Sequence, residues 1–515
     1  MSSSPQPSQT VRHGDKRYPA LSRGFNQRWI ATPEYVRLVR SPEDARASLE
    51  AAVRETPKNP DRKRITVRSG GHCYEDFVCG TDVRVILDVS PMCDMYHDSD
   101  MDAYCVEAGA GNWHGYSHLY PMSGKALPGG SCYSVGLGGH ITGGGYGLLS
   151  RQFGLTVDYL YAVEVAVVKP DRSVELVVAK RDDPDPDLKR LWWAHTGGGG
   201  GNFGLITRFW FRDLPEPPSM VMLAGLAWDW KHFTKDDFTS LLTAFGTYFR
   251  DNQDPSTAAG KLFAMLVLNH FSNGQIGLLA QVDIDDPGGR AAMKEFIEKV
   301  DGGIGPKATA MRTSMGERPT VAQAQIPRDM PWLTATQALD SSGEDQCGKY
   351  KSAYISKPFD AAQMDAMWVG LNENGHPGYS NKQSVIQIDS YGGAINRPPR
   401  DTAARQRGSI MKMQYQVYWT KNDQKEADYL AWIRDTYKAT FAKTGGVPVV
   451  GGDNTDGCYI NYPDVDLNDT EKWNRSTQKW WTLYYKDAYS TLQQVKKRWD
   501  PLNVFHSTQS VRLPD

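Results

Sequence analysis

The sequence feature that most constrains the fold is a glycine-rich stretch from Leu127 to Phe153, which holds nine glycines. Glycine is used at this density where the backbone passes very close to another group or adopts a positive φ. A flexible linker would pair glycine with serine and lack large apolar residues, whereas Val135, Leu137 and Ile141 are interleaved here. We therefore expect the stretch to pack inside a domain, with flat backbone around a large planar ligand and Cys132 at the edge of that ligand.

These glycines do not predict a dinucleotide-binding turn of the Rossmann type. The segment from Gly136 to Gly139 is not part of a strand–turn–helix pattern with a following acidic residue, and that fingerprint requires both. We therefore set a Rossmann fold aside.

Composition and charge exclude several classes of partner. The net charge is −2 and the chain has no basic block, so we expect neither nucleic acid nor an anionic membrane as a partner. No apolar stretch approaches the roughly 18–20 residues that a membrane helix needs. Fifteen tryptophans and 25 tyrosines favour a site for flat or sugar-like molecules.

The cysteine pattern argues against a metal site. The seven cysteines contain no CxxC pair and no zinc-site spacing, so no metal is expected. Their odd number predicts free thiols, or one cysteine with a separate task. The N-terminus lacks the apolar core of a secretory signal, and a cytoplasmic protein follows as the default expectation.

The order of the predicted elements indicates more than one domain in the 515 residues. We expect residues 1–20 to form a disordered tail. The proline-rich segment 213–219 marks a boundary, after which strands alternate with helices. Examples are the strands at 261–269 and 275–283 and the helices at 235–250, 289–300 and 423–443. This order predicts an α+β domain in which helices cover one face of an antiparallel sheet.

Several motifs occur along the chain in a specific order. They are RSGGH (68–72), GGSC (129–132), GGHITGGGYG (138–147), TGGGGGNFG (196–204), YINYPD (459–464) and NVFHSTQSV (503–511). In content, order and spacing they resemble the berberine-bridge-enzyme-like FAD-linked oxidases of the vanillyl-alcohol-oxidase superfamily. The resemblance covers nearly the whole chain, and it is strongest to bacterial members that oxidise carbohydrates or glycosylated natural products.

The resemblance implies an α+β architecture of two parts. An FAD-binding domain of the vanillyl-alcohol-oxidase type would be formed by residues 21–212 together with the returning segment 451–515. A substrate-binding domain, with an antiparallel sheet covered by helices, would be inserted between them over residues 213–450. The implied activity is that of an FAD-dependent oxidase, which removes a hydride from a hydroxyl-bearing carbon and passes electrons to O2 to give H2O2.

The family pattern also implies FAD attached at two positions, His72 and Cys132. An imidazole nitrogen can add to an electrophilic flavin methide at the 8α carbon, and a thiolate can add to the electron-poor ring at carbon 6. Taken singly, a core histidine and a buried thiol are the simpler interpretations. The pair of motifs, with the two residues sixty positions apart, reverses that preference.

Further cofactor-binding positions come from the same motifs. The turn from Arg68 to Gly71 would wrap a phosphate with backbone N–H groups. The aromatic neighbours of the five consecutive glycines, Trp192, Trp193 and Phe203, argue against an exposed flexible loop there. Besides His72 and Cys132, the predicted set is Arg68, Ser69, Gly70, Gly71, Gly129, Gly130, Val135, Gly138, Gly139, His140, Gly143, Gly197, Gly201, Asn202, Phe203 and Asn461.

For catalysis, a tyrosinate is a fitting base for the hydroxyl proton. The family motif places it at Tyr462, with Tyr146 of GGGYG helping to stabilise the anion. Tyr391 and Asp389 lie where relatives place supporting residues, although Asp389 also fits a solvated strand position. Tyr459 is a further candidate that also fits a purely packing role.

Two other functions remain open from the sequence. One is oxidative cyclisation of an alkaloid or polyketide on the same scaffold, and the absence of glutamate between Asn374 and Lys425 disfavours the glutamate base used by cyclising relatives. The other is a flavin-binding recognition protein without turnover, which would need no intact base.

Valine at 135 is the residue that goes with oxidases in this family. The expected partners are therefore a small-molecule substrate and O2, with the protein a monomer or a homodimer.

Overall fold

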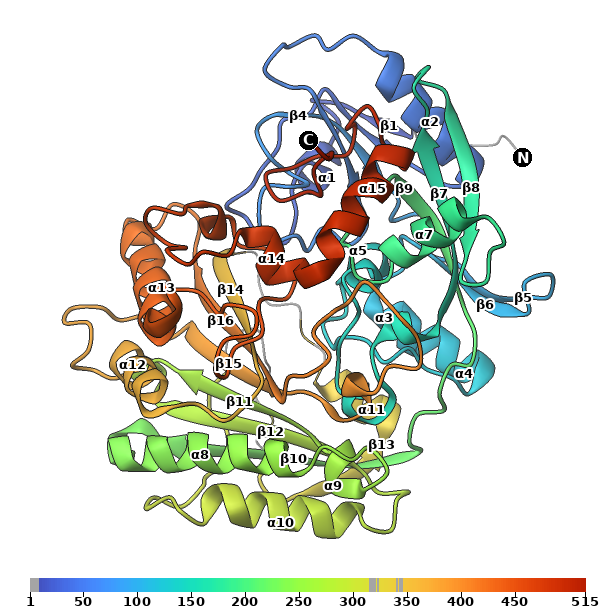
Figure 1. Ribbon diagram of the computed structural model, residues 1–515. Helices are drawn as coiled ribbons and strands as arrows, with labels where there is room; N and C mark the ends of the chain where they lie inside the picture. The colour runs from blue at the N-terminus through green and yellow to red at the C-terminus, as the bar shows by residue number, and fades with distance from the viewer. Residues whose placement is uncertain (1–8, 315–320, 322–323, 340, 342–345) are drawn as a thin grey trace.

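The computed structural model describes residues 9–314, 321, 324–339, 341 and 346–515. In this part of the chain the named strands form three sheets, and helices pack against them (Figure 1). None of its helices is both long enough and apolar enough to cross a membrane.

The N-terminal segment forms a four-stranded sheet. Strands β2 and β3 run parallel to the central β4, and β1 adds an antiparallel edge. Helix α2 (Pro42–Arg54) begins at Ser41, whose hydroxyl accepts a hydrogen bond from Asp44 N at 3.1 Å and thereby caps the helix. The strands are β1 (Thr10–Val11), β2 (Tyr35–Leu38), β3 (Arg64–Arg68) and β4 (Val83–Asp88).

The expected disordered tail over residues 1–20 is wrong for its second half. Strand β1 pairs with β2, and helix α1 (Tyr18–Leu21) follows it. The buried Tyr18 donates a hydrogen bond from its hydroxyl to Pro33 O at 2.8 Å. Strand pairing and this aromatic anchor order the segment, and its polar composition does not reveal either contact. Residues 1–8 lie outside the described residues.

A second, five-stranded sheet is antiparallel throughout, in the order β5-β6-β9-β7-β8. Strand β7 is buried along its whole length, as its valine-rich sequence predicts. The glycine-rich stretch lies in the connection between β6 and β7 and contains the short helices α5 and α6. The elements are β5 (Met95–Asp98), β6 (Ala103–Glu107), α5 (Leu137–Thr142), α6 (Ser150–Phe153), β7 (Leu160–Val168), β8 (Val174–Lys180), α7 (Pro186–Ala194) and β9 (Leu205–Phe211).

The middle of the chain forms a seven-stranded antiparallel sheet in the order β13-β10-β12-β11-β15-β16-β14. Helices α8, α10, α12 and α13 lie along its outer side (Figure 1). The elements are β10 (Met220–Asp229), α8 (Lys235–Asp251), α9 (Ala258–Lys261), β11 (Phe263–Asn269), β12 (Gln275–Asp283), α10 (Gly289–Asp301), β13 (Arg328–Pro331), α11 (Trp332–Ala338), β14 (Cys347–Ile355), α12 (Ala361–Leu371), β15 (Ser384–Ser390), β16 (Met411–Trp419) and α13 (Glu426–Thr440). This arrangement confirms the α+β class.

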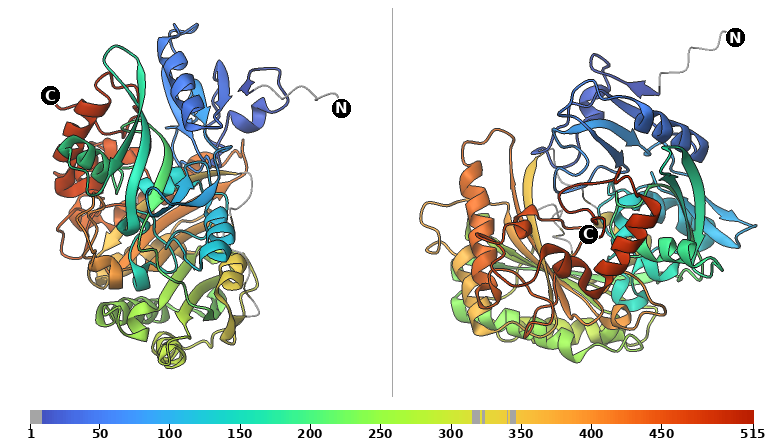
Figure 2. Two further views of the ribbon diagram at one scale, coloured as in Figure 1. Left: turned by 90° about the vertical axis from the view of Figure 1, so that its right-hand side faces the viewer. Right: turned by 45° about the horizontal axis from the view of Figure 1, so that its top comes forward.

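The C-terminal segment returns to the N-terminal part of the chain. Helices α14 (Trp480–Tyr485) and α15 (Tyr489–Trp499) lead back from the seven-stranded sheet, and α15 packs beside α7 (Figure 2). The buried Lys496 in α15 donates to Asn202 O at 2.8 Å, and Val511 N donates to Asn202 Oδ1 at 2.8 Å. The two ends of the chain therefore contribute to one structural unit around the run of five glycines.

Candidate active site

A cavity of about 310 Å³ lies where these parts of the chain meet. Its wall combines β3 and the loop after it, the glycine-rich stretch, the five-glycine run, strands β11, β15 and β16, and the C-terminal segment. Cavities of this size hold small molecules and cofactors. Segments hundreds of residues apart in sequence therefore converge on one site.

The loop that follows β3 places His72 in the cavity wall. Its ring stacks on Phe25 with ring centroids 4.4 Å apart, and its Nε2 lies 2.7 Å from Ser134 Oγ. Burial, and to a smaller extent the positive charge of Arg68, lowers the pKa of His72 to about 4. The imidazole is therefore neutral at pH 7, and a neutral imidazole retains a nucleophilic nitrogen.

The loop that carries Cys132 touches the His72 loop through the backbone. A Cβ at Gly136 would lie 2.1 Å from Gly70 N, and a Cβ at Gly70 would lie 2.2 Å from Gly136 N. Any side chain at either position would push the loops apart, so only glycine permits this approach. The contact brings His72 and Cys132 into the wall of the same cavity.

The wall also fits a flat, anionic ligand such as FAD. Arg68 lines the cavity and donates from Nη1 to Asp88 Oδ2 at 3.1 Å, but its Nε is buried without a partner among the described residues. Gly139 and Gly201 line the cavity as well, and a Cβ at either would meet nothing within 4 Å. A buried donor left for a ligand and glycines that leave the cavity open are the features that such a cofactor needs.

On the sheet side of the cavity, a buried lysine lies among tyrosines. Lys412 in β16 is 1% exposed at its side chain, and its Nζ donates to Tyr462 Oη at 3.1 Å. The same Nζ lies 3.2 Å from Asp389 Oδ2 and 4.1 Å from the ring centroid of Tyr146. Because Asp389 and Lys412 are directly paired across β15 and β16, the sheet register holds this ion pair on one face.

The surroundings of Tyr146 and Tyr459 disfavour the charged form of each phenol. Burial and, next, the negative charge of Asp389 raise the pKa of Tyr146 well above its ordinary value. Burial raises the pKa of Tyr459 to about 12, with Lys412 acting in the opposite direction. Tyr146 and Tyr459 are therefore neutral at pH 7. Among the described residues, the Lys412 ammonium donates its hydrogen bond to a phenol at Tyr462.

Most of the predicted residues lie in the cavity wall. Those that line it are Arg68, Ser69, Gly70, Gly71, His72, Gly130, Cys132, Val135, Gly138, Gly139, His140, Tyr146, Gly201, Asn202, Asp389, Tyr459, Asn461 and Tyr462. His140 accepts a hydrogen bond at Nε2 from Gly130 N at 3.0 Å, and Asn461 Nδ2 donates to Tyr459 Oη at 2.9 Å.

Five predicted residues lie behind the wall instead. They are Gly129, Gly143, Gly197, Phe203 and Tyr391, none of which lines the described cavity. The Tyr391 hydroxyl donates to Gln406 O at 3.0 Å and is buried. Gly143 leaves room for Asn461, whose Oδ1 lies 2.1 Å from the place of a Cβ at Gly143. These residues support the wall through packing.

Lys412 is the site residue that sequence reasoning missed. The segment from Met411 to Gln416 alternates apolar and polar residues, which is typical of a strand with one polar face. In a strand that is buried throughout, a lysine on that face needs a partner. The alternating pattern is visible in the sequence, but the role of Lys412 follows only from its pairing with Asp389.

Comparison with known proteins agrees with this site. Residues 33–171 match an FAD binding domain, and residues 458–512 match the family of berberine and berberine-like proteins. The chain is 40% identical to aclacinomycin-N/aclacinomycin-A oxidase of Streptomyces galilaeus, over 97% of this chain and 89% of that protein. It is 38% identical to hexose oxidase of Chondrus crispus, over 96% of this chain and 93% of that protein.

Solved structures show the same relationship. The structure of a glycopeptide hexose oxidase in complex with teicoplanin superposes with a TM-score of 0.86 at 36% identity, covering 98% of both chains. The chain therefore belongs to the berberine-bridge-enzyme-like family, and it is an FAD-dependent oxidase. This confirms the family and the cofactor that the sequence motifs predict.

The ion pair at the centre of the site yields a stability prediction. Lys412→Met leaves Asp389 buried with Gln387 Nε2 as its side-chain donor among the described residues, so we expect a loss of about 3–5 kcal/mol of stability. The double variant Lys412→Met/Asp389→Asn has no unpaired buried carboxylate, so part of the lost stability should be recovered. Thermal melting of the holoenzyme measures both effects. Lys421→Met, on the exposed turn after β16, is the matched control and should change stability little. If the double variant lost as much as the sum of the single variants, the pair would not be coupled.

Proposed function

We propose that this oxidase removes a hydride from a hydroxyl-bearing carbon of a sugar or a glycosylated natural product, with Tyr462 as the base. The observation that carries the proposal is the buried Lys412 ammonium, which donates to Tyr462 Oη at 3.1 Å inside the cavity that also contains His72 and Cys132. FAD, held by the cavity wall that contains His72 and Cys132, would supply the hydride acceptor. The remaining steps belong to residues of this chain.

The proton step follows from the electrostatics of the site. A buried cation hydrogen-bonded to a phenol oxygen stabilises the phenolate relative to the phenol. Tyr462 as phenolate accepts the proton of the substrate hydroxyl, and Asp389, 3.2 Å from Lys412 Nζ, is the carboxylate partner of the ammonium. Tyr146 and Tyr459 stay neutral, so they shape the site without competing for the proton. The Asp389 carboxylate is already occupied by Lys412 and Gln387, which disfavours it as the base of a cyclising reaction.

The proposed substrate class agrees with the wall beside Tyr462. Tyr74 lines the cavity, stacks on Tyr350 with centroids 3.6 Å apart, and accepts a hydrogen bond from Gln414 Nε2 at 2.9 Å. Phe263 lines the same cavity. Aromatic faces with a polar handle suit sugars and planar aglycones. Relatives in the family include proteins named as a hexose oxidase and an aclacinomycin oxidase.

We propose the domain division that the sequence predicts, with residues 21–212 and 451–515 binding FAD and residues 213–450 binding substrate. Supporting this division, the seven strands of the large sheet all fall between Met220 and Trp419. The motifs predicted to bind the flavin lie outside that range, and the sheet contributes Asp389 and Lys412 to the cavity.

Tyr462→Phe should slow flavin reduction by about 10²–10⁴-fold, because loss of a general base typically has that effect. Anaerobic stopped-flow absorbance with a panel of saturating sugars and glycosylated compounds measures the rate. Binding of substrate and retention of flavin should be nearly unchanged. Tyr459→Phe is the control and should lose less. A Tyr462→Phe enzyme that reduces at the wild-type rate would show that the base lies elsewhere.

We propose that FAD is attached covalently at both His72 and Cys132. Acid-precipitated wild-type protein should therefore stay yellow, and a proteolytic digest should give one flavin-linked species that contains both peptides. His72→Ala and Cys132→Ala should each retain flavin through the other residue, and the double variant should release it in acid. Cys93→Ala, outside the described cavity wall, is the control. Release of flavin from the wild-type protein in acid would refute the proposal.

We propose O2 as the electron acceptor, because Val135 lines the cavity three residues after Cys132, and valine at this position goes with oxidases in the family. Val135→Leu puts a bulkier side chain in the cavity wall and should slow reoxidation of the reduced enzyme in aerated buffer, together with formation of H2O2. Stopped-flow mixing measures the rate, and Val369→Leu at an exposed site is the control. Slow reoxidation of the wild-type enzyme by O2 would count against this assignment.

A further inference from the structure

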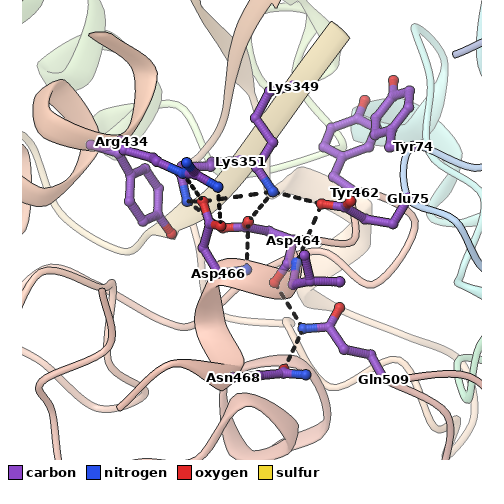
Figure 3. A network of polar contacts seen from close by, with 12 residues as sticks. Tyr74, Glu75, Lys349, Lys351, Arg434, Tyr462, Asp464, Asp466, Asn468 and Gln509 are labelled. Atoms are coloured by element: carbon purple, nitrogen blue, oxygen red, sulfur yellow. Dashed lines mark hydrogen bonds and ion pairs between the residues drawn. The ribbon is translucent and has the colours of Figure 1, made fainter. Parts of the chain in front are cut away.

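A cluster of six charged side chains, five of them buried and Arg434 partly exposed, lies beside Tyr462 and is not used by the proposed reaction (Figure 3). Its cations and carboxylates are equal in number, so the cluster is neutral as a whole. The members are Lys349, Lys351 and Arg434, with Glu75, Asp464 and Asp466. Apolar residues of similar volume often stabilise a fold at least as well as such a cluster, so stability alone does not account for it.

Lys349 is the member that joins two functional segments. Its Nζ lies 2.6 Å from Glu75 Oε1 and 2.7 Å from Asp464 Oδ1, and all three side chains are at most 2% exposed. Glu75 is three residues after His72, and Asp464 is two residues after Tyr462. One ammonium group thus connects the loop of the proposed flavin attachment to the loop of the proposed base.

Other contacts make this connection rigid. Val465 N donates to Glu75 Oε1 at 3.3 Å, so the backbone of the Tyr462 segment also reaches the His72 loop. Gln509 Nε2 donates to Asp464 O at 2.8 Å. Although burial disfavours its charged form, the carboxylates of Asp464 and Glu75 raise the pKa of Lys349 above its ordinary value. Lys349 therefore stays charged throughout the working pH range.

We propose that Lys349 is a positioning residue that fixes the Tyr462 segment to the His72 loop, and so sets the place of the Tyr462 phenol relative to Lys412 and the flavin. This inference rests on the proposed role of Tyr462. Lys412 donates to the Tyr462 phenol, and the rings of Tyr459 and Tyr74 lie 5.0 and 5.5 Å from its ring. Tyr146 and Asp389 both lie against the same Lys412 ammonium. If the segment shifts, the phenol moves away from the Lys412 ammonium.

Lys351 provides a matched control. It lies two residues along β14, is equally buried, and pairs with Asp464 at 2.7 Å and Asp466 at 2.8 Å. Among the described ion pairs it has none with Glu75. Lys351→Met therefore removes the same charge from the same cluster but keeps the connection between the two loops.

The test compares Lys349→Met, Lys351→Met and Glu75→Gln. Lys349→Met should slow flavin reduction by about 10–100-fold, because small misplacements of reacting groups have effects of that order, and it should move the pH profile of the rate upward. Glu75→Gln removes a negative charge, whereas Lys349→Met removes a positive one. Because Glu75→Gln weakens the same connection, it should also move the pH profile to higher pH. A purely electrostatic effect would shift these two variants in opposite directions.

Hydrogen–deuterium exchange of peptides covering residues 459–466 gives a readout that is independent of turnover. Exchange should become faster in Lys349→Met and Glu75→Gln than in Lys351→Met. If Lys349→Met does not fold, the isosteric Glu75→Gln carries the comparison with Lys351→Met. Equal rates, profiles and exchange in the two lysine variants, or opposite profile shifts for Lys349→Met and Glu75→Gln, would overturn the positioning role.

Failure of this inference is distinguishable from failure of the proposed function. If Tyr462→Phe reduces at the wild-type rate, the base assignment is wrong, and the positioning role falls with it. If Tyr462→Phe is slow but Lys349→Met behaves as Lys351→Met does, only the positioning role is wrong.

Discussion

The proposed chemistry depends on the buried ammonium of Lys412. Lys412 is buried in the cavity wall between a carboxylate at 3.2 Å and a phenol oxygen at 3.1 Å. An ammonium group in that position is stable only with a negative partner, and Asp389 provides it through the register of β15 and β16. The same ammonium then favours negative charge on Tyr462. In the proposed mechanism, the seven-stranded sheet therefore also sets the reactivity of Tyr462 in the C-terminal segment.

A second constraint is the backbone contact between the loops of His72 and Cys132. Gly70 and Gly136 approach so closely that no Cβ fits at either position, and this contact places an imidazole and a thiol in the wall of one cavity. The segment that carries Tyr462 lines the same cavity, and the ion pairs of Lys349 connect it to the His72 loop. The two loops and the sheet are thus fixed relative to one another by close packing on one side and by ion pairs on the other.

The parts of this arrangement that follow from local sequence could be predicted. The alternation of strands and helices after 213 follows from local patterns. The family motifs pointed to His72, Cys132 and Tyr462, and all three line the cavity. Lys412 and Lys349 could not be predicted in the same way, because their roles depend on partners far away in the chain, Tyr462 for one and Glu75 and Asp464 for the other. The order in residues 10–21 was missed for the same reason, since pairing with β2 and burial of Tyr18 are long-range contacts.

The central claim is that Lys412 stabilises the phenolate form of Tyr462. The most direct measurement is the pH dependence of the anaerobic flavin reduction rate in the wild-type enzyme, in Lys412→Met and in the control Lys421→Met. The rate should fall as the pH decreases through the pKa of the base. In Lys412→Met this falling limb should move to higher pH, while Lys421→Met should match the wild type. A limb that stays at the wild-type pH when Lys412 is removed would contradict the account.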